Sequence, residues 1–449
     1  MQEHKLAGTN IQKLLFKLSI PATIGMLTMA LYNVVDTIFV GRGVGPMAIG
    51  GLAVVFPIQI FIMAIGQMMG MGGASLISRS IGAGDLSKAS RAYGNVLLSN
   101  IFWGILITTA GLIFTDPILN LFGATAEIMP HARAYMRIII LNAAVSMFQM
   151  SSNNILRSEG RAKTAMGSML IAAITNIILD PIFIFSFDMG IKGAALATVI
   201  AQITTSIYIF FFLTSKKSTI QLRLKHLKLD WNLLKEIYAI GISAFFRSVG
   251  QSILVIIVNN GLGKYGGSIY IAAFGAVNRL ISFAIMPIIG IAQGLQPIVG
   301  YNFGAKRYMN TVKSFRYAAT YATIFSTFAC VLLLSIPHHI MHILSTDPKL
   351  VEIGIHIIKT IVIAFPVVGF QINGAMFYQA TGQALPAFIL TTSRQILFLI
   401  PLLLILPNFY QIEGILIAFP LADLFAATLT FFFILREIKQ IKQYCQVET

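Results

Sequence analysis

Two aspartates lie inside long apolar stretches of this 449-residue chain, Asp36 in LYNVVDTIFVG and Asp180 in NIILDPIFIF. If these stretches cross a membrane, placing each carboxylate near the bilayer centre costs about 3 kcal/mol. Such a residue is therefore first interpreted as part of a functional site. Tyr32 precedes Asp36 by four residues and Asn176 precedes Asp180 by four, so each pair shares one helix face. Carboxylate, amide and hydroxyl oxygens are hard ligands, which suit a proton or a small cation such as sodium.

The composition places these stretches in an integral membrane protein. Hydrophobic residues make up 57% of the chain and charged residues 11%, against about 25% charged in soluble proteins. A helix needs about 20 apolar residues to cross a bilayer. The runs are continuous rather than alternating, which favours helices over barrel strands. We predict twelve helices, at 15–40, 49–80, 90–116, 128–156, 163–187, 191–214, 233–262, 269–300, 311–337, 350–379, 385–408 and 412–436.

The chain carries 32 Lys and Arg against 16 Asp and Glu, and most of the basic residues fall on one side of this topology. They gather in the N-terminal tail, in the loops that follow the even-numbered spans, and in the C-terminal tail. The positive-inside rule therefore predicts that both termini are cytoplasmic. Because the basic residues are dispersed over six inner segments, topology explains them better than nucleic acid binding does.

An internal duplication is visible when the chain is compared with itself at an offset of 222 residues. Five glycines of the first half then fall on glycines of the second half: Gly41, Gly45, Gly72, Gly82 and Gly160 on Gly263, Gly267, Gly294, Gly304 and Gly382. Each copy has six spans, so both copies enter the membrane in the same orientation, related by a pseudo-two-fold axis along the membrane normal. We predict an all-α fold with an N-lobe at 1–214, a basic cytoplasmic linker at 215–232 and a C-lobe at 233–449.

Counting about 1.5 Å per residue along each span brings the polar residues of the N-lobe to one depth. Asp36, Asp180 and Thr198 all fall in the outer half of the membrane, and Asn176 joins them, which predicts one cation site. Hydrogen bonding between neighbouring helices is the structural alternative. The C-lobe lacks these acids, but Arg247 and Asp423 come out near its midplane. A buried ion pair between these two residues is possible, with a structural role favoured over a role in transport.

A substrate cleft is less visible in the sequence. The 33 Phe and 19 Met suit the binding of flat lipophilic cations, although most of them face lipid or pack. Polar candidates occur in the first, fourth and tenth spans: Tyr32, Gln149, Asn153, Asn154, Gln371, Asn373 and Tyr378. Hydrogen bonding between helices explains these residues equally well.

Four sequence features together resemble the multidrug and toxic compound extrusion (MATE) family, and in particular its bacterial NorM- and DinF-related branches. They are Pro21 with Asp36 in the first span, GMGGASLISRSIGAGD after the second, AQGLQPIVGYNFGAKR after the eighth, and Asn176 with Asp180 followed by GAALAT. The resemblance covers nearly the whole chain. The Asn176–Asp180 pair with the GAALAT segment is its most specific element.

The resemblance implies a monomeric secondary transporter of a bacterial inner membrane, not an enzyme, that needs no cofactor. Such a protein exports organic cations or other amphiphiles in exchange for Na⁺ or H⁺ by alternating access. By position, Asp36, Asn176, Asp180 and Thr198 inherit the role of the N-lobe cation site.

The main alternative is a lipid-linked oligosaccharide flippase of a related superfamily. Its cavity would need cationic groups for a pyrophosphate, and Arg247, Arg279 and Arg394 keep this alternative open. The acid pair of the N-lobe argues against it. An intramembrane enzyme would need a nucleophile–base constellation, and none stands out in the sequence.

Overall fold

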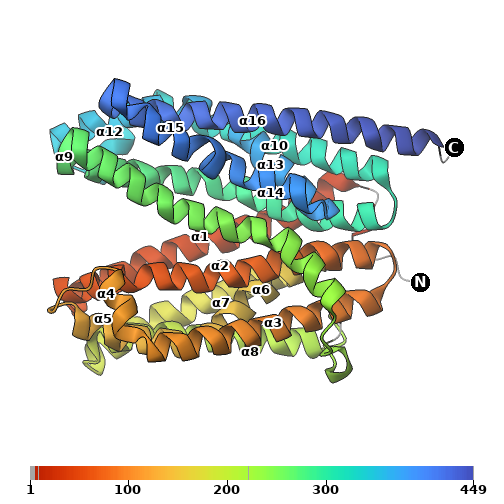
Figure 1. Cartoon of the computed structure of the whole chain (residues 1–449), viewed down its shortest axis with the longest axis horizontal. Coiled ribbons are helices and arrows are strands. Elements are labelled where there is room, and N and C mark those ends of the chain that lie inside the picture. Colours follow the sequence, from red (N-terminus) through yellow and green to blue (C-terminus); the bar gives the residue numbers. More distant parts are fainter. Residues whose placement is uncertain (1–5, 9, 221, 448–449) are drawn as a thin grey trace. The chain divides into compact units, whose positions relative to one another are not determined.

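The computed structural model describes residues 6–8, 10–220 and 222–447. These residues form helices and connecting loops without a β-strand (Figure 1). Seven helices each match one predicted span: α1 (Ile11–Gly43), α2 (Pro46–Gly82), α3 (Leu86–Ile113), α7 (Ala162–Pro181), α8 (Gly190–Thr214), α10 (Tyr308–Ser335) and α16 (Pro407–Val447). The prediction of an all-α membrane fold is confirmed.

The remaining spans are interrupted helices. Three are built from consecutive pieces: α5 (Met129–Leu141) with α6 (Ala143–Ser158), α12 (Pro348–Ile361) with α13 (Phe365–Thr381), and α14 (Ala384–Thr392) with α15 (Ile400–Ile405). The 74-residue α9 (Trp231–Gly304) contains two helices that meet at Gly267, whose φ is 74°. Ten helical segments of the described chain are long and apolar enough to cross a membrane. With α9 divided and α5 joined to α6, the arrangement is consistent with twelve spans.

The duplication is visible in the backbone as well as in the sequence. Residues with positive φ recur at the offset of 222: Gly45 with Gly267, Gly84 with Lys306, and Gly160 with Gly382. The fifth span of each copy contains a segment of π-helix, Ile182–Ser186 in the first copy and Ser393–Leu399 in the second. These π-helices, and the short helices α4 (Thr115–Leu121) and α11 (Pro337–Leu344), were not foreseen from hydropathy.

The described residues divide into two compact units. One consists of Ile24–Phe245, and the other of the chain up to Thr23 together with the chain from Phe246 onward. The dividing points therefore lie inside α1 and α9, and they too are 222 residues apart. In each unit, a glycine permits two helices to pack closely. In one unit a Cβ at Gly72 would strike the backbone of Ile237, and in the other a Cβ at Gly294 would lie 2.9 Å from the Ser19 nitrogen.

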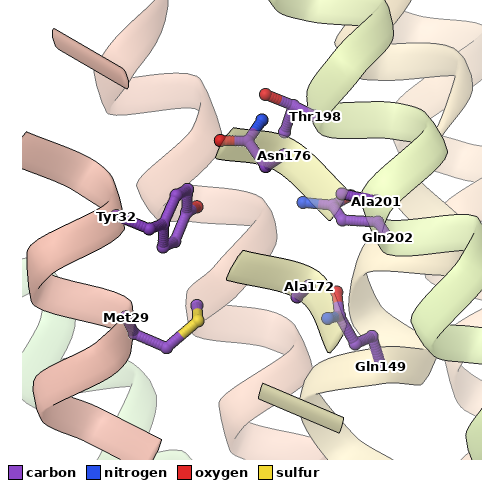
Figure 2. Close-up of a pocket in the computed structure, with 8 residues that line it drawn as sticks. All are labelled: Met29, Tyr32, Gln149, Ala172, Asn176, Thr198, Ala201 and Gln202. Carbon is purple, nitrogen blue, oxygen red and sulfur yellow. The ribbon is translucent and has the colours of Figure 1, made fainter. Parts of the chain in front are cut away.

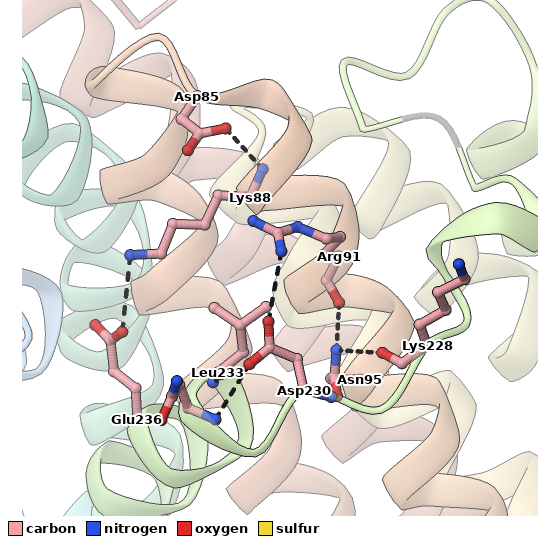
Figure 3. A network of polar contacts seen from close by, with 9 residues as sticks. Asp85, Lys88, Arg91, Asn95, Lys228, Asp230, Leu233 and Glu236 are labelled. Carbon is pink, nitrogen blue, oxygen red and sulfur yellow. Dashed lines mark hydrogen bonds and ion pairs between the residues drawn. The ribbon is translucent and has the colours of Figure 1, made fainter.

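Within the unit Ile24–Phe245, polar contacts fasten the end of the linker to α3 (Figure 3). The side-chain amide of Asn95 donates to the Lys228 carbonyl at 3.1 Å, and its oxygen accepts from the Asp230 backbone nitrogen at 2.9 Å. Arg91 lies 3.5 Å from the Asp230 carboxylate. Six residues after Asp230, Glu236 pairs with Arg79 of α2 at 2.7 Å. The C-terminal end of the basic linker is thus packed against α3 of the unit Ile24–Phe245.

Candidate functional site

Three helices of the unit Ile24–Phe245 bring the predicted cation-site residues to one place. Asp36 comes from α1, Asn176 and Asp180 from the last turns of α7, and Thr198 from α8. Asp180 is fully buried and Asn176 is 2% exposed. The Asn176 Nδ2 group donates a hydrogen bond to Asp180 Oδ1 at 3.2 Å. The carboxylates of Asp36 and Asp180 lie close enough to influence each other electrostatically.

Local backbone geometry explains this arrangement. Pro181 follows Asp180 directly and has no N–H, so α7 gives way to the π-helix Ile182–Ser186 at this point. On α8, a Cβ at Gly193 would lie 2.8 Å from the Phe183 backbone, so only glycine lets α8 approach the π-helix this closely. The next turn of α8 carries Thr198, whose hydroxyl donates to the Ala194 carbonyl at 3.0 Å and keeps its acceptor capacity.

The site has an excess of oxygen acceptors. Among the described residues, neither Asp36 nor Asp180 forms an ion pair with a Lys or Arg. Three buried oxygens have no hydrogen-bond partner in the described part of the chain, namely Asp36 Oδ1, Asn176 Oδ1 and Asp180 Oδ2. An unpaired buried acceptor costs about 1–3 kcal/mol. A proton or a small cation would satisfy these oxygens, so the residues present fit a Na⁺ or H⁺ site.

A cavity of about 30 Å³ adjoins these residues (Figure 2). Its lining residues are Met29, Tyr32, Gln149, Ala172, Asn176, Thr198, Ala201 and Gln202. In Figure 2, Met29 and Tyr32 of α1 face the α7 and α8 side chains across the space. About 30 Å³ corresponds to a single water molecule in the liquid, whereas drug-sized ligands occupy about 300–1,000 Å³. The cavity therefore suits an ion or a water molecule, and Tyr32 and Gln149 line it. The cleft role predicted for these two residues stays a prediction.

Sequence reasoning missed two nearby polar residues. Tyr135 of α5 lies within electrostatic range of both acids, and its hydroxyl accepts a 3.1 Å hydrogen bond from Gln59 of α2. Nothing in the spacing around Tyr135 signals this position. Gln202 lines the cavity and accepts from Asn142 at 2.5 Å. Gln202 could have been found, because it lies four residues after Thr198 on the same face of α8.

The other cleft candidates of the first copy are held in helix packing. Asn153 donates to the Ala165 carbonyl at 3.0 Å and to the Ser168 hydroxyl at 2.8 Å. Asn154 donates to Gln67 at 3.0 Å. Both amide oxygens accept hydrogen bonds from Arg157, which is 4% exposed. These contacts account for Asn153 and Asn154 without a ligand.

The candidates of the second copy are also buried. Tyr378 donates to the Phe433 carbonyl at 2.6 Å, and Asn373 donates to the Gly369 carbonyl at 2.8 Å. Gln371 is 4% exposed, and its Oε1 has no hydrogen-bond partner among the described residues. None of the three lines the cavity beside Asn176.

The predicted ion pair between Arg247 and Asp423 is wrong. Asp423, which is 3% exposed, pairs with Arg394 through both guanidinium Nε and Nη2. Depth counting places residues along the membrane normal but not around the helix axis. The π-helix Ser393–Leu399 adds a residue to its turn, and Arg394 lies at its start, beside α16. The buried pair therefore links the eleventh and twelfth predicted spans.

An all-helical membrane fold with an internal repeat, and an acid pair in only one copy, is typical of a secondary transporter. The sequence model of the MatE family matches residues 21–182 and 243–405, one match for each copy. The chain belongs to the MatE family of MATE transporters, as its motifs predicted. Members of this family are transporters rather than enzymes and need no cofactor.

Individual relatives agree with this assignment along the whole chain. The multidrug export protein MepA of Staphylococcus haemolyticus is 29% identical over 430 residues, covering 95% of this chain and 94% of its own. MepA of Staphylococcus aureus strain MRSA252 is 28% identical over 415 residues, covering 92% and 90%. A solved outward-facing multidrug resistance MATE transporter of the MOP superfamily superimposes with a TM-score of 0.92 at 26% identity, covering 99% of both chains.

Proposed function

We propose that this protein is a multidrug efflux antiporter that exports cationic or amphiphilic organic compounds in exchange for H⁺ or Na⁺. The observation that carries the proposal is the Asp36–Asp180 pair, in which buried carboxylate oxygens have no hydrogen-bond partner and neither acid forms an ion pair with a described Lys or Arg. The multidrug export names of the MepA relatives support efflux as the direction of transport. The staphylococcal origin of the MepA relatives supports a bacterial cytoplasmic membrane, and the distribution of Lys and Arg supports cytoplasmic termini. We propose that the protein is a monomer.

In the proposed mechanism, the ion links α1 to α7 and α8. A proton or Na⁺ bound between Asp36 and Asp180 would compensate one of their two negative charges, and Asn176 and Thr198 would complete the oxygen ligands of a Na⁺. Ion binding thus changes how strongly the outer half of α1 is held against α7. The residues of α1 up to Thr23 belong to the other compact unit. We infer that α1 carries the effect of the ion from the copy at 1–214 toward the copy at 233–449, as alternating access requires.

The ion-site proposal is tested with purified protein in liposomes, where efflux of ethidium is driven separately by a sodium gradient and by a pH gradient. We expect one of the two gradients to drive efflux in the wild type. In Asp36→Asn and in Asp180→Asn the efflux rate should fall at least about tenfold, because each substitution removes a negative charge that attracts the ion. Asp188→Asn is the matched control, since Asp188 is exposed and its positive φ suits asparagine. Full gradient-driven efflux by Asp36→Asn, or no response of the wild type to either gradient, would overturn the antiport mechanism.

A further inference from the structure

A second and much larger cavity lies in the unit that contains the second copy. Its volume is about 360 Å³. Residues of α9 form one wall, and the end of α11 with the start of α12 forms the other: Ile271, Ala272, Gly275, Ala276, Arg279, Leu344, Ser345 and Leu350. This volume falls in the range of about 300–1,000 Å³ that is usual for small-molecule sites. Nothing in the proposed ion coupling uses this cavity.

Small residues on one face of α9 create the space. Ile271, Gly275 and Arg279 are spaced by four residues, so they follow one another along the same helix face. A Cβ built on Gly275 would meet no heavy atom within 4 Å. Ile271 supplies apolar surface on this wall, and Leu344 supplies it on the opposite one. The cavity is therefore largely apolar, and the guanidinium of Arg279 lies at one end of its α9 wall.

The charge of Arg279 has no partner in the structure. Arg279 is exposed, and it forms no ion pair or hydrogen bond with any residue that the structure describes. This differs from Arg394 on a neighbouring span, which is paired with Asp423. An arginine inside a membrane-spanning helix is unfavourable unless water or a counter-ion solvates it. No acidic side chain lines the cavity, and the Ser345 hydroxyl is the other polar side chain of its lining.

We propose that this cavity binds the anionic head group of an amphiphile. The guanidinium of Arg279 holds a carboxylate, sulfonate or phosphate with its fork of donors. The Ser345 hydroxyl donates a further hydrogen bond, and the apolar walls at Ile271 and Leu344 cover the adjoining hydrocarbon. The required chemistry is an anion attached to an apolar body. A soluble amphiphile and an anionic membrane lipid both provide it.

The test uses the full chain in nanodiscs of phosphatidylcholine, with empty nanodiscs as the background. The probe is dansyl-labelled undecanoate, and dansyl-labelled undecylamine is its cationic counterpart. We expect the carboxylate to bind and the amine to bind at least about tenfold more weakly, since a charge-assisted hydrogen bond contributes about 1.5–3 kcal/mol. Arg279→Gln should weaken carboxylate binding by about the same factor, and Arg279→Lys should weaken it less.

Two further variants separate the site from general effects. Gly275→Trp fills the chamber but keeps Arg279, so it should also exclude the carboxylate. Arg316→Gln is the matched control, because Arg316 is an exposed arginine of the same unit outside the cavity lining. Equal binding of the two probes, or wild-type carboxylate binding by Arg279→Gln, would overturn the proposal. Because this assay measures binding rather than transport, its result is independent of ion coupling.

Adding phosphatidylglycerol to the nanodiscs identifies the source of the anion. Competition with the probe would assign the site to a lipid head group. Unchanged probe binding would assign it to soluble amphiphiles. Either result, together with the loss of binding in Arg279→Gln, supports an anion site at Arg279.

Discussion

Glu159 provides a test of pH dependence outside the membrane-spanning segments. It lies between α6 and α7, is 1% exposed, and caps the C-terminus of α6, where the helix dipole disfavours a negative charge. The Ser218 hydroxyl donates to its carboxylate at 2.8 Å, and the Thr219 backbone nitrogen donates at 3.0 Å. Burial raises the pKa of Glu159 from 4.5 to about 7, and these hydrogen bonds and the charge of Arg161 offset only part of this effect.

The sign of the effect on stability follows from proton binding. Between pH 4.5 and about 7 the native state holds the Glu159 proton and the unfolded state has lost it. The free energy of unfolding therefore falls as the pH rises through this window, and the loss is complete above about pH 7. At about 1.4 kcal/mol for each tenfold change, the difference amounts to about 3 kcal/mol. Glu159→Gln removes this titration, at a cost of about 1 kcal/mol for a weaker hydrogen bond to the linker.

Thermal unfolding in nanodiscs, at about pH 5 and about pH 8, measures this difference. From the lower to the higher pH, the apparent melting temperature should fall by more in the wild type than in Glu159→Gln. At the higher pH the variant should be the more stable of the two proteins. Glu127→Gln is the matched control, because Glu127 is exposed on the described surface. If Glu159→Gln keeps the full pH dependence of the wild type, the titration of Glu159 is not its cause.

Two further predictions concern packing in each unit. Asp423→Asn should lower the free energy of unfolding by about 1.5–3 kcal/mol, because it removes a charge-assisted hydrogen bond between buried Asp423 and partly exposed Arg394. The double variant Arg394→Met/Asp423→Leu should recover most of this loss in thermal unfolding, and an Asp423→Asn variant as stable as the wild type would contradict the pairing. Gly193→Ala should weaken the apparent ion affinity by at least about tenfold, since its Cβ would lie 2.8 Å from the Phe183 backbone and displace α8. Gly41→Ala, whose nearest neighbour would be 3.6 Å away, should leave that affinity unchanged in the same efflux assay.

The length of each membrane span and the depth of a residue within it could be predicted from the sequence. The spans follow from runs of about 20 apolar residues, and their depth follows from the helical rise. These two quantities bring Asp36, Asp180 and Thr198 to one level, and the structure places them on three helices of one unit. The helix face shared by Asn176 and Asp180 also follows from spacing alone, and the 3.2 Å hydrogen bond between them bears this out.

Properties that depend on rotation about a helix axis could not be predicted. Asp423 pairs with Arg394 instead of Arg247 because the π-helix and the packing against α16 decide which arginine turns toward it. The position of Tyr135 within electrostatic range of the acids has a similar origin, since it depends on how α5 packs beside α2. Hydropathy contains no information on either contact.

The position of the two dividing points in α1 and α9 has a consequence for the origin of this chain. The segment of α1 up to Thr23 packs with the second copy, and the segment of α9 up to Phe245 packs with the first. Each copy therefore lends the start of its own first helix to the other, which is the arrangement of a domain-swapped dimer. A single six-helix copy would leave these contacts unmade, so we expect a copy expressed alone to need a second chain to complete its core.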